Sequence, residues 1–214
     1  MENTGLSEHL LAHDLIAIYH FVPDEVAIFL YDQFRSAEVI FNDSLVSDAK
    51  GDAYADSDTP YQQVLTQARI SRTAFASRFP ATVQKALNFI RQNAAKMIGG
   101  VQVSQFEPWQ CTWYKSGGKF DYHEDCGNWA SNERLYTVML TIKAPDSGGQ
   151  THFNHIEKTV ESQAGRMLIW RNLDSENRCN GRMMHAGLPV GDGSNPDDDK
   201  MILVTWIRRF DYGH

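Results

Sequence analysis

Residues 114–125 read YKSGGKFDYHED, and this stretch decides which fold the chain can adopt. The turn signal Ser116-Gly117-Gly118 divides it, and a short run suited to a β-strand lies on each side. The pattern predicts two strands, over Gln110–Lys115 and Lys119–Asp125. The stretch therefore opens a region of short strands rather than continuing a helix.

The pattern of short strands separated by turns continues on both sides of this stretch. Further strands are expected at Val101–Phe106, Arg134–Lys143, Lys158–Glu161, Arg166–Trp170, Gly181–Ala186 and Met201–Phe210. Turn signals separate them, above all Ser147-Gly148-Gly149 and the segment Gly191–Asp199. Many short strands with frequent turns are typical of a β-sandwich or a jelly roll.

The first hundred residues read as mostly helical. Proline and two acids at residues 23–25 open an apolar-periodic stretch formed by Val26, Phe29, Leu30 and Phe34. A second helix is expected from about Pro80 to Ile98, where Gly99-Gly100 ends it. Helices first and strands later indicate a helical layer packed on a β core.

Two polar segments are expected at the surface. Asn42–Pro60 is rich in Asp, Ser and Gly and lacks apolar periodicity, so we interpret it as a loop that could close over a ligand. Asp197-Asp198-Asp199 is too short for an acidic tail and is interpreted as a solvated turn.

Composition narrows the class of protein. The 214 residues are 42% hydrophobic and 22% charged, with a formal net charge of −7, and no basic run occurs. This disfavours a nucleic-acid partner. Cys111, Cys126 and Cys179 are widely spaced and odd in number, so reduced thiols are expected. No targeting signal or membrane-spanning apolar stretch is present, and a cytoplasmic location is predicted.

The pair His123 and Asp125 carries the first chemical signal. Side chains two residues apart on a strand point to one face, so these two converge while Glu124 points away. An imidazole and a carboxylate make two thirds of the facial triad that holds non-haem iron. The third ligand remains open on spacing alone, because His152, His155, His185 and His214 all follow.

An ordered set of motifs resembles the prolyl 4-hydroxylase family of Fe(II)- and 2-oxoglutarate-dependent oxygenases. The matches are Tyr114–Asp125, Arg134–Leu140, the turn Gly148–Thr151, the strand Gly165–Trp170, the histidine segment His185–Val190, and then Lys200 and Trp206. Arg69–Phe79 also resembles the segment before the family's long helix. They follow the family's order over roughly residues 20–210. The resemblance implies an α+β fold: a distorted double-stranded β-helix, which is a cupin-like jelly roll, with the N-terminal helices packed on one sheet. We expect one domain over residues 1–214, with a helical support region at 1–100 and the catalytic core at 101–210.

The resemblance also implies roles for individual residues. The iron ligands would be His123, Asp125 and His185. Lys200, Tyr114 and Thr151 would bind the distal carboxylate of 2-oxoglutarate, as a buried cation with two hydroxyls can. Arg134 and Trp206 would line the substrate side. No catalytic residue beyond the metal ligands is implied.

The activity implied is hydroxylation of a C–H bond, with 2-oxoglutarate decarboxylated to succinate and CO2 and ascorbate keeping the iron reduced. The favoured substrate is a prolyl residue in a peptide or protein, with molecular oxygen as the other partner. Alternatives are a hydroxylase of a free amino acid or small natural product, a nucleic-acid demethylase that the acidic charge disfavours, and a catalytically silent jelly-roll binding module. The intact triad and Lys200 argue against the last of these.

The sequence departs from the family pattern in three places. Phe120 replaces a frequent Tyr, Tyr122 replaces a usual Pro, and an insertion around Asp192–Asp199 lengthens the connection to Lys200. The insertion leaves Arg208 or Arg209 as a rival co-substrate anchor. Alternation along the last strand places Lys200, Ile202, Val204, Trp206 and Arg208 on one face, which excludes Arg209. The order of matches, together with distance along the strand, favours Lys200 over Arg208.

Overall fold

The computed structural model describes residues 7–36, 38–47, 63–64, 67–127, 133–192 and 194–212. Its two α-helices are α1 (Asp24–Arg35) and α2 (Ala81–Ile98). The described residues also form the short 3-10 segments η2 (Ala76–Arg78), η3 (Val103–Gln105), η4 (Asn154–Ile156) and η5 (Gly181–Met183). Among the described residues, neither helix combines the length and apolar character needed to cross a membrane.

Strands make up most of the remaining secondary structure. The first seven are β1 (Ser7–Ala12), β2 (Leu15–Tyr19), β3 (Asn42–Asp43), β4 (Val46–Ser47), β5 (Gln63–Val64), β6 (Arg69–Ile70) and β7 (Arg72–Phe75). The others are β8 (Gln110–Lys115), β9 (Lys119–His123), β10 (Arg134–Lys143), β11 (Thr151–Phe153), β12 (Lys158–Val160), β13 (Met167–Arg171), β14 (His185–Gly187) and β15 (Asp199–Arg208).

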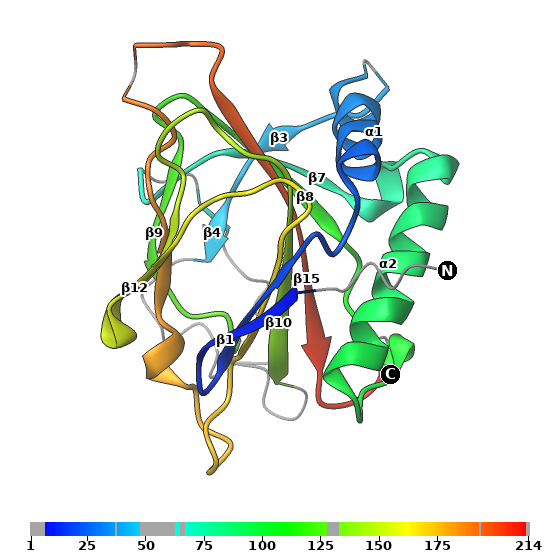
Figure 1. Cartoon of the computed structure of the whole chain (residues 1–214), viewed down its shortest axis with the longest axis vertical. Helices are drawn as coiled ribbons and strands as arrows, with labels where there is room; N and C mark the ends of the chain where they lie inside the picture. Colours follow the sequence, from blue (N-terminus) through cyan, green and yellow to red (C-terminus); the bar gives the residue numbers. More distant parts are fainter. Residues whose placement is uncertain are drawn as a thin grey trace.

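Two antiparallel sheets face each other, which is the jelly-roll arrangement expected. The larger sheet has the order β1-β2-β13-β10-β15-β8-β7-β3, and the smaller has the order β12-β11-β14-β9-β6. β4 and β5 form a separate pair. Figure 1 shows the smaller sheet, with β9 and β12, on the side of the molecule away from the helices.

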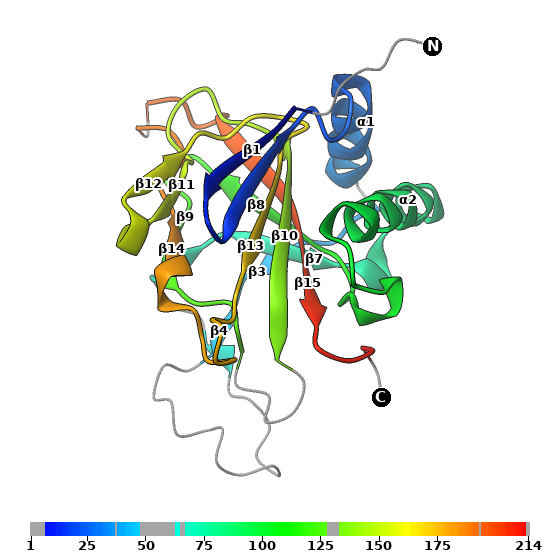
Figure 2. The ribbon, with the colours of Figure 1, turned by 60° about the horizontal axis from the view of Figure 1, so that its bottom comes forward.

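Both helices pack on the outer face of the larger sheet, as Figures 1 and 2 show. Strand alternation produces this division. On β15, Met201, Leu203 and Ile207 belong to the core shared with the helices, while Ile202 and Val204 face the space between the sheets. The predicted alternation of this strand is thus confirmed.

Each helix begins where proline fixes the backbone. Pro23 and Pro80 occupy the N-cap positions, and Gly99 ends α2 with a φ of 69°, a conformation that favours glycine. The expected inward face of α1 was partly wrong. Ala27, Leu30 and Phe34 are buried, whereas Phe29 is 41% exposed.

The expectation of a mainly helical first hundred residues was also wrong. β1 and β2 form a hairpin that joins the larger sheet beside β13, and β3, β6 and β7 extend both sheets. The hairpin turn at His13-Asp14 has no Gly or Pro, so its sequence lacks the usual turn signal. The strand expected at Val101–Phe106 is instead the 3-10 segment η3 followed by an isolated bridge at Phe106.

The two polar segments differ from expectation. Asn42–Ser47 forms β3 and β4, and the rest of the expected loop, residues 48–60, lies outside the described residues. The expected solvated turn holds for Asp197, which is exposed, but is wrong for Asp198 and Asp199, which are each only 5% exposed. Asp199 accepts hydrogen bonds from the Tyr31 hydroxyl at 3.0 Å and the Trp113 indole at 2.7 Å, so it fastens β15 to α1 and β8.

Candidate metal centre and co-substrate pocket

A cavity of about 70 Å³ lies between the two sheets. Its lining comes from both sheets and combines an apolar wall with a few polar groups. Among the lining residues are His123, Asp125, His185, Tyr114, Thr151, Lys200 and Trp206. Seven of the eight site residues expected from the sequence therefore face one space, and Arg134 is the exception.

The smaller sheet places the two histidines side by side. β9 and β14 pair in register at His123 and His185, and their rings are 4.3 Å apart. Asp125 follows the end of β9, with its Oδ1 3.8 Å from Nε2 of His123 and its Oδ2 3.6 Å from Nε2 of His185. One ligand atom from each residue lies within 4.8 Å of the others, close enough to share a metal ion.

Hydrogen bonds fix the orientation of the two imidazoles and of the Asp125 carboxylate. Nδ1 of His123 lies 2.8 Å from the carbonyl of Asp121, and Nδ1 of His185 lies 2.9 Å from that of Met183. A carbonyl only accepts, so each Nδ1 carries the proton and each Nε2 keeps a lone pair for a metal. Thr137 donates to Oδ2 of Asp125 at 2.8 Å and orients the carboxylate.

The electrostatics suit a divalent cation. Burial lowers the pKa of His123, which keeps its imidazole neutral. Burial alone would raise the pKa of Asp125, but the neighbouring His185 and His123, together with the Arg134 guanidinium and the hydrogen bond from Thr137, lower it overall, so the carboxylate is ionised. Neutral imidazole and ionised carboxylate are the protonation states that ligands must have. Two nitrogens and one carboxylate fit the facial set used by non-haem Fe(II).

Of the rival histidines, the two in the described part of the chain lie away from the cavity. His152 bonds to Thr159 through Nδ1 at 2.9 Å and contacts the ring of Tyr122, and it does not line the cavity. His155 borders a separate hollow near Cys179. His214 lies outside the described residues. The geometry therefore gathers His185, and neither His152 nor His155, with His123 and Asp125.

Lys200 is a buried cation without a carboxylate partner among the described residues. It pairs in register with Tyr114, is 3% exposed, and donates from Nζ to the carbonyl of Gly149 at 2.6 Å. Burial lowers its pKa to about 8. Gly149 has a φ of 66°, and a Cβ there would meet the side chain of Pro145 at 2.8 Å, so glycine lets this backbone approach the lysine.

Tyr114 and Thr151, the two residues expected beside Lys200, both line the cavity. Tyr114 lies opposite Lys200 on β8, and Thr151 begins β11 with its side chain buried at the cavity. Burial raises the pKa of Tyr114, so this hydroxyl stays protonated and can donate a hydrogen bond. A buried ammonium with two hydroxyls is a suitable receptor for one carboxylate.

A charged cluster lies beyond the cavity, at the other end of β15. Arg134 stacks 3.7 Å over the ring of Trp206 and donates to both carboxylate oxygens of Glu107, at 2.6 and 2.9 Å. Nε of Arg208 is also 2.8 Å from Glu107. Arg208 is thus engaged with this glutamate and does not line the cavity, whereas Lys200 does.

The sequence reasoning missed Arg69 and Glu107. The guanidinium of Arg69 lines the cavity and stacks 4.6 Å over Phe120, whose ring in turn lies 3.7 Å from that of His123. Its other contacts are long hydrogen bonds to neutral oxygens, such as 3.4 Å to Thr112. Arg69 lies on the two-residue strand β6, too short to show a pattern. Glu107 lies in an irregular segment before β8, where spacing gives no signal.

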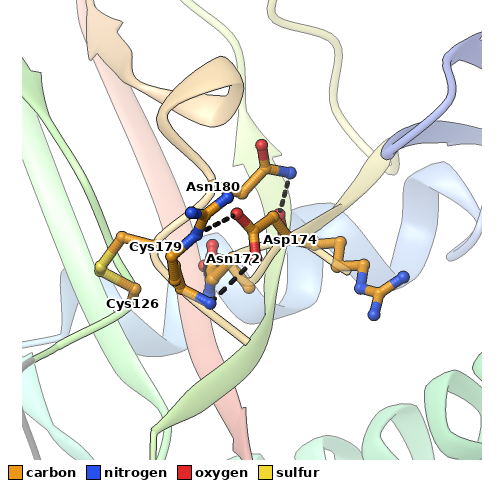
Figure 3. The surroundings of a disulfide bond; sticks show 8 residues. Cys126, Asn172, Asp174, Cys179 and Asn180 are labelled. Atoms are coloured by element: carbon orange, nitrogen blue, oxygen red, sulfur yellow. Dashed lines mark hydrogen bonds and ion pairs between the residues drawn. A yellow bond between two sulfur atoms is a disulfide. The ribbon is translucent and has the colours of Figure 1, made fainter. Parts of the chain in front are cut away.

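The expectation of reduced thiols was wrong for two of the three cysteines. Cys126 and Cys179 form a disulfide, and only Cys111 is a free thiol, buried under the helices. Figure 3 shows the bond beside Asn172, Asp174 and Asn180. The two partners are 53 residues apart in sequence and only the fold brings them together, so no spacing rule could identify the pair.

Known proteins are similar to this chain over the region that contains the candidate site. A model of the 2OG-Fe(II) oxygenase superfamily matches residues 109–208. Prolyl 4-hydroxylase subunit alpha-3 of Mus musculus is 28% identical over 207 residues, covering 92% of this chain and 34% of that protein. Subunit alpha-1 of Caenorhabditis elegans is 24% identical over 194 residues, covering 85% and 32%. The chain thus spans about a third of the length of these curated relatives.

Solved structures share the fold. The viral collagen prolyl hydroxylase of Paramecium bursaria Chlorella virus-1, in its 2OG complex, gives a TM-score of 0.59 at 22% identity, covering 93% of this chain and 98% of that one. A prolyl-4-hydroxylase of Pseudomonas putida gives 0.59 at 20% identity, covering 92% and 94%. These likenesses identify the fold as the double-stranded β-helix of the 2OG oxygenases. The chain is thus similar to the 2OG-Fe(II) oxygenase superfamily over the region that holds the metal centre, and to prolyl 4-hydroxylases over most of its length.

Proposed function

We propose that this chain is an Fe(II)- and 2-oxoglutarate-dependent dioxygenase that hydroxylates a prolyl residue in a peptide or protein. His123, Asp125 and His185 would hold Fe(II), which with 2-oxoglutarate supplies the oxidising power for hydroxylation of a C–H bond, yielding succinate and CO2. Ascorbate is proposed as the reductant that maintains the iron. The relatives named as prolyl 4-hydroxylases support this substrate class.

One observation carries the proposal. The cavity has an ionised carboxylate beside two imidazoles at one position and, at another, the cation Lys200, which has no carboxylate partner among the described residues. A ligand that binds the metal at one end and presents a free carboxylate at the other would satisfy both. 2-Oxoglutarate has this form, and Tyr114 and Thr151 would satisfy the remaining lone pairs of its distal carboxylate.

The remaining work of the protein is positioning. Arg134 is held rigidly by Glu107 and Trp206, so this pair of side chains offers a preformed wall against which a substrate could be oriented. Phe120 supplies an apolar surface stacked on His123. Neither the Arg134–Trp206 pair nor Phe120 needs to transfer a proton in the proposed reaction. This agrees with the expectation that no catalytic residue is needed beyond the metal ligands.

The test is turnover with defined substrates. Protein supplied with Fe(II), 2-oxoglutarate and ascorbate should release succinate and add one oxygen to proline-containing peptides, as read by mass spectrometry. His185→Ala should abolish both signals, and His152→Ala, a histidine outside the cavity, should retain them. Oxygen addition to free amino acids but to no peptide would replace the peptide substrate with the small-molecule alternative. No succinate release with either set would reject the proposal.

The cytoplasmic location remains a prediction. The reduced-thiol argument for it no longer holds, because disulfides persist mainly in oxidising compartments and Cys126 is bonded to Cys179.

A further inference from the structure

The disulfide joins the two chain segments that carry the metal-ligand residues. Cys126 directly follows Asp125, and Cys179 lies six residues before His185. β9 ends at His123, so Asp125 lies beyond the last residue whose position the sheet fixes. The bond from Cys126 therefore provides covalent support where regular structure has ended.

The Cys179 end of the bond is itself firmly held. Leu173 and Cys179 form a backbone bridge, and the turn between them is closed by Asp174, whose carboxylate accepts from the backbone and side chain of Arg178 at 2.9 and 3.0 Å. The backbone N–H of Asn180 donates to the backbone carbonyl of Asn172 at 2.8 Å. Figure 3 shows these groups clustered beside the sulfur atoms. Cys126 is thus tied to a rigid support.

The same loop reaches Asp125 by a second route. Asn172 donates from Nδ2 to the hydroxyl of Thr137 at 2.9 Å, and Thr137 donates to Oδ2 of Asp125 at 2.8 Å. The hydrogen bonds fix the carboxylate and the disulfide fixes the backbone beside it. Apart from the disulfide, one backbone hydrogen bond holds Cys126 among the described residues. The backbone N–H of Arg134 donates to the carbonyl of Cys126 at 3.1 Å.

We propose that the Cys126–Cys179 disulfide is a positioning element that holds Asp125 in ligand geometry, so that its oxidation state sets the affinity for the metal. The inference rests on the proposed metal site. Reduction by a dithiol breaks the S–S bond, takes up two electrons and two protons to give two thiols, and leaves the dithiol as a disulfide. Cys179 is exposed and offers the reductant a point of attack, whereas Cys111 is fully buried and unreactive.

Reduction should weaken metal binding without unfolding the chain. Changes to groups that orient metal ligands typically lower metal affinity about 10- to 100-fold, and a loss of about tenfold or more is expected here. Co(II) is a suitable probe because its binding is seen by absorption without oxygen chemistry. The freed thiols lie close to Glu124, so any second Co(II) site there would show thiolate charge-transfer absorption.

The experiment is an anaerobic Co(II) titration of four samples: the oxidised protein, the protein reduced with a phosphine, the double variant Cys126→Ser with Cys179→Ser, and the control Cys111→Ala. Near-ultraviolet circular dichroism at the same temperature reports whether each is folded. Reduced and double-serine proteins should bind Co(II) at least tenfold more weakly while folded, and reoxidation should restore the affinity. The control should match the oxidised protein.

Affinities equal within about twofold in folded samples would overturn the inference, as would a loss of affinity that appears only with loss of the folded signal. If the double variant fails to fold, the reversible reduction of the native chain decides alone. A His185→Ala variant separates this result from the proposed function. If Co(II) binding does not depend on His185, the metal site itself is wrong, whereas binding that needs His185 but ignores the disulfide refutes only the inference.

Discussion

Replacing Lys200 with methionine should stabilise the protein in the absence of 2-oxoglutarate and, at the same time, abolish binding of 2-oxoglutarate. Methionine keeps the length and apolar stem of lysine but removes the charge. The one hydrogen bond lost is from Nζ to the carbonyl of Gly149, and that carbonyl still accepts from the hydroxyl of Ser162 at 2.7 Å. The substitution therefore leaves no buried acceptor unsatisfied.

The magnitude follows from the desolvation of the ammonium. Burial lowers the pKa of Lys200 from 10.5 to about 8, and each pKa unit corresponds to about 1.4 kcal/mol, so the charged lysine costs folding about 3 kcal/mol at neutral pH. In a domain of this size, 1 kcal/mol moves Tm by about 2–4 °C, which predicts a rise of about 6–12 °C. The bound carboxylate of 2-oxoglutarate would offset this cost in the native protein.

The assay is urea unfolding at pH 7 with Zn(II) as a redox-silent metal, with and without 2-oxoglutarate. The native protein should gain stability with the ligand, and Lys200→Met should start higher and gain nothing. Lys85→Met, an exposed lysine on α2, is the control and should change the free energy of unfolding by less than about 0.5 kcal/mol. A Lys200→Met protein less stable than the native one without ligand would refute the reasoning, because the lysine would then have an anionic partner.

Three other outcomes are expected. The affinity for 2-oxoglutarate should be greatest below pH 8 and fall as pH rises through about 8, since the free lysine then loses the charge that binds the carboxylate; calorimetry that finds no fall up to pH 9.5 contradicts this. Alanine at His123, Asp125 or His185 should eliminate metal binding in equilibrium dialysis, and a loss at His152 instead would move the metal site. Arg208→Ala should leave the KM for 2-oxoglutarate within about threefold, because Arg208 pairs with Glu107 outside the cavity; a steep rise would move the co-substrate anchor from Lys200 to Arg208.

The strands that could be predicted are those with long apolar alternation. β10 was predicted with its observed bounds, and the two faces of β15 were assigned correctly, because both strands have one side on the helix core and the other on the cavity. The N-terminal strands could not be predicted. β2 is apolar on both faces because it packs between other elements, and a short run of that kind fits a helix equally well.

Some residues of the candidate site could be predicted from local sequence, and others could not. His123 and Asp125 are close in sequence, so strand geometry alone predicts their convergence. His185 joins them only through the pairing of β14 with β9, and local sequence could not choose it over His152. The family resemblance supplied that choice. Neither Arg69 nor Glu107 had a local pattern that could indicate a place in the site.

The acidic run before Lys200 shows why local composition misled the sequence reading. Three successive aspartates indicate solvent exposure, yet strand alternation sends Asp199 and Lys200 to opposite sides of β15. On one side Asp199 meets the donors of Tyr31 and Trp113, and burial together with the hydrogen bond to Asp199 raises the pKa of Tyr31 to about 12. On the other side, the hydrogen-bond acceptor that the described residues offer Lys200 is a carbonyl. Adjacent opposite charges are therefore kept from neutralising each other, and this separation leaves a cation free for a carboxylate from outside the chain.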